Sequence, residues 1–342
     1  MKHLTVLTVF AAVALLSCSG GEGPTGVAPV KYWDIAFESP DAVITGIDMV
    51  SETSGWACGY RFNEISGASD GLIYHYDGET WKVALFVPAE TGIRFKGIDF
   101  LSDTEGWAVG MRDGGGSGPV VLQYDGAAWS EIPVEGLNGG ELNFVTAFGP
   151  ADIWLCDGHA SYHFDGAVWT PFPITEIGEI TGWCFPAPEI GWAVDYRSGY
   201  CYRWDAAAFA WTLEPYPLYN VTAFYFLPDG SGYYADYQNV PPVGARANIY
   251  KRVPGDVITY ERVFSSNQDR VVTACAFYIP DYFLFAGPNA AYEVTGDKVE
   301  PAGYVPAGGL GGVRALSAAA PKDVWGVQSQ NPYTGPSFIV HK

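Results

Sequence analysis

Positive charge is scarce in this chain, and so are the long apolar runs of membrane proteins and the periodic runs of helical ones. The 342 residues include 18 Lys and Arg against 38 Asp and Glu, which gives a formal net charge of −20. Such a chain repels nucleic acid and anionic lipid headgroups, so we expect neither as a partner through bulk charge. No heptad and no extended 3.6-residue period appears, which argues against an α-rich fold.

Metal-binding and catalytic motifs are absent as well. The six Cys and five His show no Cys-x-x-Cys or His-x-x-His spacing, so we expect no metal and no cofactor. There is no Gly-x-Ser-x-Gly elbow, phosphate loop or His-Glu-x-x-His motif. The cysteines after Cys18 are odd in number and sit in apolar segments, which favours buried free thiols. They are Cys58, Cys156, Cys184, Cys201 and Cys275.

The N-terminus predicts export. Residues 1–17 begin with Lys2 and His3, and the apolar stretch from Leu4 to Leu16 is too short for a stable membrane anchor. It ends in Leu15-Leu16-Ser17-Cys18, which resembles the bacterial lipobox and implies a lipid on Cys18. Residues 18–30 are rich in Gly and predict a flexible tether. By similarity to enterobacterial lipoproteins, Ser at position 19 favours the outer membrane or cell surface. The alternative is an ordinary signal peptide that ends in Cys.

Aromatic residues and turn formers are abundant: 22 Tyr, 19 Phe, 12 Trp, 42 Gly and 24 Pro. They are arranged in a repeat of four short apolar strands, A to D, as in Gly55-Trp56-Ala57-Cys58-Gly59 and Gly106-Trp107-Ala108-Val109-Gly110. The central aromatic of strand B recurs at intervals of roughly 40–50 residues, which suits a propeller blade. These aromatics are Trp56, Trp107, Trp154, Trp192, Tyr233, Phe283 and Trp325.

Two further positions are filled by the same kind of residue in successive units of the repeat, and each such set is called a column. A small residue marks strand A, where inner strands crowd around an axis: Gly46, Gly97, Ala147, Gly182, Ala223, Ala274 and Ala315. Asp-Gly joins strands C and D in three units and predicts type I′ hairpin turns, each followed by a Trp that starts strand D. The pairs are Asp77-Gly78, Asp125-Gly126 and Asp165-Gly166.

The two ends of residues 31–342 complete each other. The seventh unit has strands A to C only, and residues 31–37 match the strand D segment 80–86. An N-terminal strand that pairs with the last blade would remove its open edge. We therefore predict an all-β fold, a seven-bladed β-propeller of four-stranded blades closed by the N-terminal strand. A misread degenerate unit would make it six or eight blades.

The Gly-Trp-Ala-Val-Gly and Asp-Gly-x-x-Trp segments resemble the repeats of Asp-box (bacterial neuraminidase) propellers and of photosystem II assembly factor propellers. Similar repeats occur in many bacterial lipoproteins, and the resemblance covers nearly all of residues 31–342. It implies the fold and a structural role for Asp77, Asp125 and Asp165, but little about function. The chain departs from the Asp box because no Ser or Thr column precedes the Asp.

Candidate ligand-binding residues lie where variable loops are expected. Length varies in the B–C loops 60–70, 111–118, 237–247 and 328–335 and in the D–A loops 133–142, 264–270 and 301–311, and variable loops on a rigid scaffold often bind. Five residues after the strand B aromatic stand Arg61, Arg112, His159 and Arg197. At the start of strand A, Lys96 and Arg314 interrupt a column of threonines. The column is Thr45, Thr146, Thr181, Thr222 and Thr273. Arginine suits carboxylate or phosphate recognition. The alternative is that these residues pair with local acids such as Asp113 or Asp195.

The function predicted from these patterns is a non-catalytic binding or assembly module at the cell envelope. It would present the B–C and D–A loop face to an envelope protein or a glycan, act as a monomer and touch the membrane only through its lipid. The alternative is a glycan-active enzyme of the sialidase-like Asp-box type, for which Arg61, Arg112 and Arg197 would be the carboxylate triad; no Tyr and Glu pair completes it. A third interpretation is a structural surface lipoprotein without a tight ligand.

Overall fold

The chain divides into two compact units, Met1–Val30 and Lys31–Lys342, and the computed structural model describes residues of the second. The described residues are 33–113, 117–137, 140–174, 178–215, 217–218, 220–240, 244–255, 257–266, 274–278, 282–287, 290–303, 313–320, 322–329 and 336–342. Cys18 and residues 1–30 lie outside them, so the signal, the lipid and the tether stay predictions.

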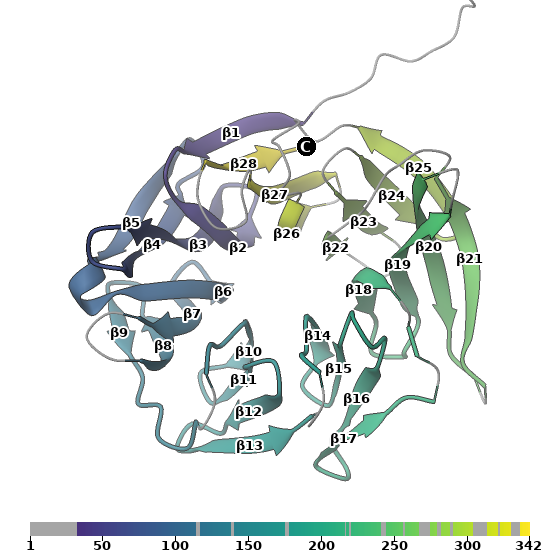
Figure 1. Ribbon diagram of the computed structural model, residues 1–342, viewed down its shortest axis with the longest axis horizontal. Coiled ribbons are helices and arrows are strands. Elements are labelled where there is room, and N and C mark those ends of the chain that lie inside the picture. The colour runs from purple at the N-terminus through teal and green to yellow at the C-terminus, as the bar shows by residue number, and fades with distance from the viewer. Residues whose placement is uncertain are drawn as a thin grey trace, which may run out of the picture. The chain divides into compact units, whose positions relative to one another are not determined.

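Seven four-stranded antiparallel sheets follow one another around a central axis (Figure 1). This confirms the predicted all-β, seven-bladed β-propeller. Blade 1 is β2 (Val43–Ser51), β3 (Ser54–Asn63), β4 (Ala68–Tyr76) and β5 (Trp81–Val87), and the 3-10 turn η1 (Ala89–Thr91) follows it. Blade 2 is β6 (Ile93–Ser102), β7 (Glu105–Arg112), β8 (Gly118–Tyr124) and β9 (Trp129–Glu131). Blade 3 is β10 (Phe144–Gly149), β11 (Asp152–Cys156), β12 (Ala160–Phe164) and β13 (Trp169–Pro173).

The other blades repeat this order from the axis outward. Blade 4 is β14 (Gly182–Ala187), β15 (Ile190–Val194), β16 (Cys201–Asp205) and β17 (Ala210–Leu213). Blade 5 is β18 (Val221–Phe226), β19 (Gly232–Val240), β20 (Gly244–Val253) and β21 (Thr259–Ser265). Blade 6 is β22 (Ala274–Tyr278), β23 (Tyr282–Ala286), β24 (Ala291–Thr295) and β25 (Lys298–Gly303).

The seventh blade is closed by the N-terminal strand, as predicted. It contains β26 (Val313–Ala320), β27 (Asp323–Ser329), β28 (Ser337–His341) and, outermost, β1 (Asp34–Ser39). β1 pairs antiparallel with β28 from Asp34 opposite His341 to Ser39 opposite Ser337. Just before β1, the buried Trp33 donates a hydrogen bond from Nε1 to the carbonyl oxygen of Ala302 in blade 6, 3.2 Å away. The closing strand is therefore held by a neighbouring blade as well as by its own.

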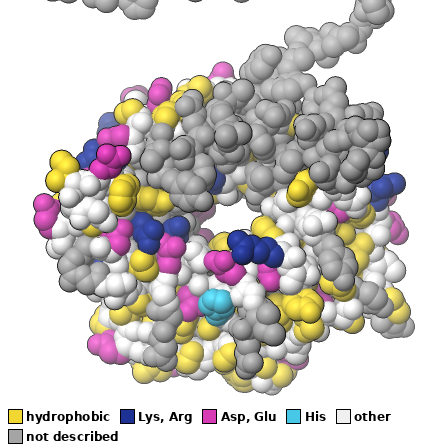
Figure 2. All heavy atoms as spheres, viewed as in Figure 1, with side chains coloured by type: hydrophobic (Ala, Val, Ile, Leu, Met, Phe, Trp, Pro, Cys, Tyr) yellow, Lys and Arg dark blue, Asp and Glu magenta, His cyan; other side chains and the backbone are white. Residues whose placement is uncertain are grey.

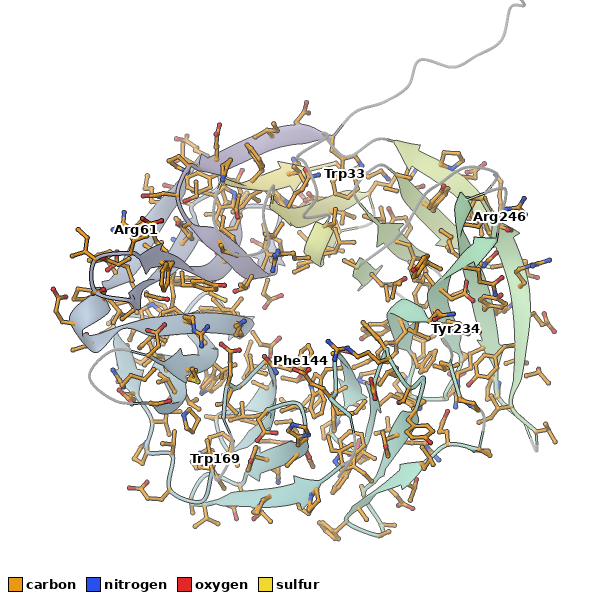
Figure 3. The ribbon with its side chains drawn as sticks, in the orientation of Figure 1. Trp33, Arg61, Phe144, Trp169, Tyr234 and Arg246 are labelled. Atoms are coloured by element: carbon orange, nitrogen blue, oxygen red, sulfur yellow. The ribbon has the colours of Figure 1, made fainter. Side chains whose placement is uncertain are left out.

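The strand B aromatics form the core, and all seven are buried. They pack against the next blade: the rings of Trp56 and Phe100, from blades 1 and 2, stack with centroids 4.6 Å apart. Side chains fill the spaces between the blades in this way around the ring (Figure 3). Cys58, Cys156, Cys184 and Cys201 are buried free thiols, as predicted, while the free thiol Cys275 is only half-buried.

The Asp-Gly turns differ from the predicted type. Gly78, Gly126 and Gly166 have φ near +90°, but Asp77, Asp125 and Asp165 do not have positive φ, so these are not type I′ turns. Each Asp instead accepts two backbone hydrogen bonds, as Asp77 does from the N–H groups of Glu79 and Thr80 at 3.1 and 2.9 Å. This is an Asx turn, in which the carboxylate satisfies the turn amides. The predicted structural role is confirmed, and the predicted Trp residues do start β5, β9 and β13.

The pairing of strand A with strand B shows that the predicted small-residue position is wrong in blades 3 and 6. Gly46 and Gly97 pair with the residue two after the strand B aromatic, Cys58 and Val109. By the same rule the position in blade 3 belongs to Phe144, opposite Cys156, and not to Ala147. In blade 6 it belongs to Cys275, opposite Phe285, and not to Ala274. A small side chain is therefore not required in every blade.

Two predicted B–C loops are mostly strand. β3 continues to Asn63 and β4 begins at Ala68, so most of 60–70 is a projecting hairpin. β19 and β20 extend the same way into 237–247. The central parts of several other predicted loops, among them 267–270, 304–311 and 330–335, lie outside the described residues.

Candidate functional site at the mouth of the central channel

A β-bulge at the start of strand A sets the direction of the side chains that face the axis. The pairing with strand B skips one residue in four blades: Thr45, Lys96, Thr222 and Arg314. A bulge leaves the extra residue unpaired and re-aims its side chain. In blades 3 and 4 the equivalent residues, Asn143 and Thr181, directly precede the strand. In these six blades one side chain is thus directed to the same end of the inner strand.

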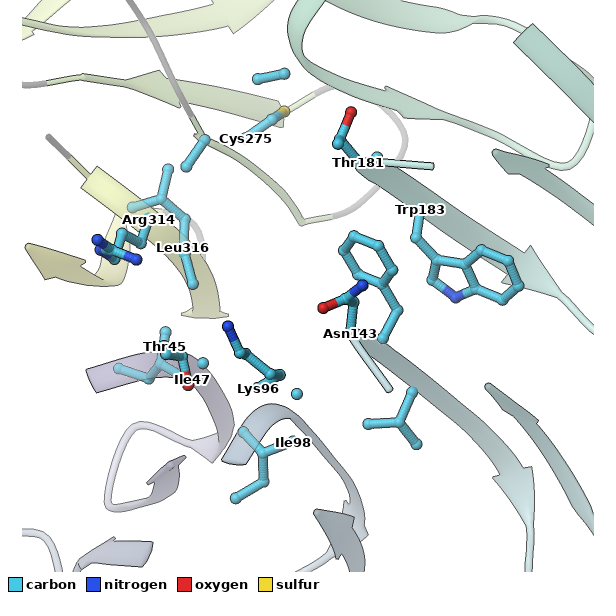
Figure 4. A pocket seen from close by; sticks show the side chains of 18 of the residues that line it. Thr45, Ile47, Lys96, Ile98, Asn143, Thr181, Trp183, Cys275, Arg314 and Leu316 are labelled. Atoms are coloured by element: carbon cyan, nitrogen blue, oxygen red, sulfur yellow. The ribbon is translucent and has the colours of Figure 1, made fainter. Parts of the chain in front are cut away.

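All of these residues except Thr222 line a cavity of about 370 Å³ on the propeller axis. Its polar wall includes Thr45, Lys96, Asn143, Thr181 and Arg314, and its apolar wall includes Ile47, Ile98, Phe144, Trp183, Phe224 and Leu316. Figure 4 shows the Lys96 side chain extending into the cavity from β6 and the amide of Asn143, from the neighbouring blade 3, beside it. The volume falls within the usual range of ligand sites, roughly 300–1,000 Å³.

The short and the long bulge side chains behave differently. Thr45 Oγ1 donates to the carbonyl oxygen of Phe95 at 2.9 Å, and Thr222 Oγ1 to that of Ala235 at 3.3 Å. These hydroxyls therefore bind backbone beside them. Lysine and arginine are long enough to carry charge beyond the strand end. Lys96 and Arg314, from blades 2 and 7, thus give the cavity two positive charges in a chain of net charge −20.

An ion network surrounds Lys96. Its Nζ lies 3.3 Å from Glu141 Oε2. Arg94 lies 3.6 Å from the same carboxylate and 3.3 Å from Asp113, which also accepts hydrogen bonds from the backbone and hydroxyl of Ser69. Lys96 and Arg94 are each only partly exposed, at 26% and 31%. The carboxylates therefore hold these cations in place and partly screen them.

Tyr60 connects this network to Arg314. The Lys96 ammonium lies over the Tyr60 ring, 5.8 Å from its centroid. Burial raises the pKa of the Tyr60 phenol, and the positive charges of Arg314 and Arg94 oppose that rise. The charges of Lys96, Arg94 and Arg314 therefore all lie near the Tyr60 ring, where blades 7, 1 and 2 meet.

Arg61 and Arg112 are bound to local acids and do not line the cavity. Arg61 donates to Asp70 from Nε and Nη2, at 2.9 and 2.7 Å, and from Nη1 to Asp41 at 3.0 Å. Arg112 binds Glu131 of β9 at 2.6 Å and the carbonyl oxygen of Thr91. Both therefore have the local pairing that was the alternative to an anion site.

His159 and Arg197 are exposed residues of B–C turns in blades 3 and 4. The backbone N–H of each is held by an Asp two residues earlier, Asp157 at 2.9 Å and Asp195 at 2.8 Å. Neither lines the cavity. The six predicted ligand-binding residues are thus divided, with Lys96 and Arg314 at the channel and the other four outside it. On the face viewed in Figure 2, acidic, basic and His side chains gather around the channel opening.

Sequence reasoning missed Asn143, Arg94 and Tyr60. A signal for Asn143 existed, because the bulge residue stands eleven positions before the strand B aromatic in blades 1, 2, 5 and 7, and so does its equivalent Thr181 in blade 4. Counting back from Trp154 by the same interval gives Asn143, whereas matching residue types gave Thr146. Thr146 also lines the cavity, and its Oγ1 accepts a hydrogen bond from Trp183 Nε1 at 3.1 Å.

The arginines proposed for a sialidase-like triad share no partner, and no carboxylate-binding cluster of the three is formed. In the described part of the chain, no group of three or more His, Cys, Asp or Glu residues is placed to hold a metal ion. Nor does any helix there have the length and apolar character to cross a membrane.

The fold and the axial cavity define the protein as a seven-bladed β-propeller. No family model matches the chain, and a search of curated proteins finds no match. Among solved structures it is similar to YCF48 bound to D1 peptide (TM-score 0.66, 17% identity, 92% of this chain and 96% of that chain). YCF48 from Cyanidioschyzon merolae has the same score and identity over 90% of this chain and 98% of that one. A catalytically inactive virginiamycin B lyase from Staphylococcus aureus has a TM-score of 0.63 and 11% identity over 90% of this chain and 99% of that one. These similarities show the fold of this chain and do not show its activity.

Proposed function

We propose that this protein is a non-catalytic binding or assembly module of the cell envelope that takes an anionic group of a partner at the mouth of its central channel. The lipid on Cys18 would tether it to the outer membrane or cell surface. The observation that carries the proposal is that Lys96 and Arg314, from separate blades, both line one cavity of a strongly acidic chain. A protein partner is favoured over a glycan because YCF48, a propeller of similar fold, is solved with a D1 peptide bound.

The geometry supports binding rather than catalysis. Lys96 is positioned by Glu141 and Tyr60 and can donate hydrogen bonds to a carboxylate or phosphate. Each charge-assisted hydrogen bond contributes about 1.5–3 kcal/mol, or roughly tenfold to one-hundredfold in affinity. The lining offers charge and apolar contact but no nucleophile paired with a base.

Affinity capture from the native envelope tests the proposal. The double variant Lys96→Ala/Arg314→Ala should bind the captured partner at least tenfold more weakly, and raised salt should weaken wild-type binding. The control is Lys82→Ala/Lys298→Ala, which removes the same charge from exposed positions beside C–D turns, away from the cavity. Equal loss in both double variants would contradict a role for the mouth. Turnover of fluorogenic sialosides or other glycosides would instead contradict the non-catalytic assignment and favour the Asp-box enzyme.

A further inference from the structure

Glu141 lies beside the cavity on a short segment between blades 2 and 3 whose backbone is fixed. The neighbouring Leu142 side chain is fully buried, and the N–H of Asn143 donates to the carbonyl oxygen of Cys156 at 2.8 Å. Asn143 also lines the cavity. The Glu141 side chain itself is 27% exposed. It can therefore turn toward solvent by rotation about its own bonds while the segment stays in place.

The Glu141 carboxylate is held loosely by its two cations. Oε2 lies 3.3 Å from Lys96 Nζ, and Oε1 lies 3.6 Å from Arg94 Nη2. By comparison, Arg112 and Glu131 approach each other to 2.6 Å. Glu141 Oε1 is buried and accepts no hydrogen bond within the described residues. A buried oxygen without a donor costs free energy, so little opposes the departure of this carboxylate except its attraction to the cations.

The two cations depend on Glu141 to different degrees. Arg94 has a second carboxylate partner, Asp113, at 3.3 Å. Lys96 has the Tyr60 ring, which lies 5.8 Å from its ammonium and attracts it without a full negative charge. If Glu141 turned away, Arg94 would stay paired, whereas the Lys96 ammonium would be available to another anion and would still rest on the Tyr60 ring.

The charge of Glu141 also reaches the surroundings of this ion pair. Burial is the largest cause of the raised pKa of the Tyr60 phenol, and the positive charges of Arg314 and Arg94 act against it. The negative charge of Glu141 acts in the same direction as burial. Glu141 therefore opposes the positive potential that the cations create at the mouth.

We propose that Glu141 is a built-in competitor for the anion site: it neutralises Lys96 in the free protein, and an anionic group of a partner binds Lys96 only as the Glu141 side chain turns away. The inference rests on the proposed function, because it concerns the selectivity of the same site. A carboxylate that belongs to the chain is present at a high effective concentration. It therefore excludes weakly bound anions and admits a partner group that binds the mouth more strongly than one carboxylate does.

Binding of inorganic phosphate at low ionic strength, measured by ³¹P NMR line broadening, tests the competitor. Glu141→Gln should bind phosphate about three- to tenfold more tightly than the wild type, because the amide keeps the shape of the side chain and removes its charge. With Lys96→Ala already present, the same substitution should change the affinity by less than about twofold. The control Glu38→Gln removes an exposed carboxylate of β1 and should also change it by less than about twofold.

The outcomes separate this inference from the proposed function. If Lys96→Ala leaves phosphate binding by the wild type unchanged, the mouth is not an anion site, and both fail together. If binding depends on Lys96 but Glu141→Gln binds no more tightly than Glu38→Gln, the proposed function stands and the competitor is wrong. Weaker binding by Glu141→Gln would also overturn the competitor, since Glu141 would then position Lys96 for the ligand.

Crystals of the wild-type protein soaked in phosphate test the same step if the variants fail to fold. With phosphate bound at Lys96, the distance from Lys96 Nζ to both Glu141 carboxylate oxygens should exceed about 4 Å, the limit of an ion pair. An unchanged separation of 3.3 Å beside a bound phosphate would show that Glu141 does not compete with it, and the proposal would be wrong.

Discussion

A buried ion pair between blades 4 and 5 offers a sharp test of how neighbouring blades are held together. Arg252 of β20 donates from Nη2 to Glu214 Oε1, which follows β17, at 2.6 Å. The two side chains are only 3% and 5% exposed. Trp192 Nε1 donates to the same carboxylate oxygen at 3.2 Å, and Arg252 also binds the carbonyl oxygen of Gly230. The carboxylate therefore depends on Arg252 for its charge compensation.

Replacing Arg252 with Met should destabilise the protein strongly, because it would leave the buried Glu214 carboxylate without its cation, with the Trp192 and Cys201 side chains as hydrogen-bond donors. Breaking a buried pair in this way costs about 3–5 kcal/mol. At about 2 °C per kcal/mol for a large domain, Tm should fall by roughly 6–10 °C. Thermal and urea unfolding followed by tryptophan fluorescence would measure both quantities.

The double variant Arg252→Met/Glu214→Leu separates the ion pair from simple packing. Removing both charges removes the desolvated carboxylate, so the double variant should regain at least about 2 kcal/mol relative to Arg252→Met. Lys251→Met is the matched control, since this neighbouring residue forms a more exposed pair with Asp297, and it should change stability by less than about 1 kcal/mol. A double variant as unstable as Arg252→Met would refute the reasoning and assign the loss to the Gly230 contact and to packing.

Two further predictions concern the N-terminal segment. Deletion of residues 31–38 should lower Tm sharply or prevent folding, because it removes most of β1 and exposes the edge of β28; unchanged thermal unfolding would contradict closure by this strand. Cys18→Ser should release the protein from the membrane fraction or leave it as unprocessed precursor. A processed variant that still fractionates with membranes would show that Cys18 is not the anchor.

The architecture was predictable because it repeats. The strand B aromatics recur in all seven units, and each is buried where the period placed it. The match between residues 31–37 and 80–86 likewise predicted the pairing of β1 with β28. Repeated burial of one face is a signal that a single sequence carries, since every blade must cover its neighbour.

The site was only partly predictable, since spacing and residue type disagreed in blade 3. Matching small residues selected Ala147 and Thr146, whereas the constant distance from the strand B aromatic selects Phe144 and Asn143, and the register follows the distance. The partners of Arg61, Asp41 and Asp70, are near it in the sequence. The Arg252–Glu214 pair could not be predicted because its two residues lie on different blades, where no local pattern connects them.

The mouth of the channel and the closure of the ring depend on the same strands. Arg314 is the bulge residue of β26, which pairs with β27, and β27 pairs with β28, which β1 completes. Ser317, three residues after Arg314, binds the backbone of β2 in blade 1 and thereby joins the first and last blades. The position of one of the two cavity cations therefore requires an intact seam. Weakening of that seam should reduce anion binding at the mouth before it unfolds the blades far from it, such as blades 4 and 5, which have their own buried ion pair.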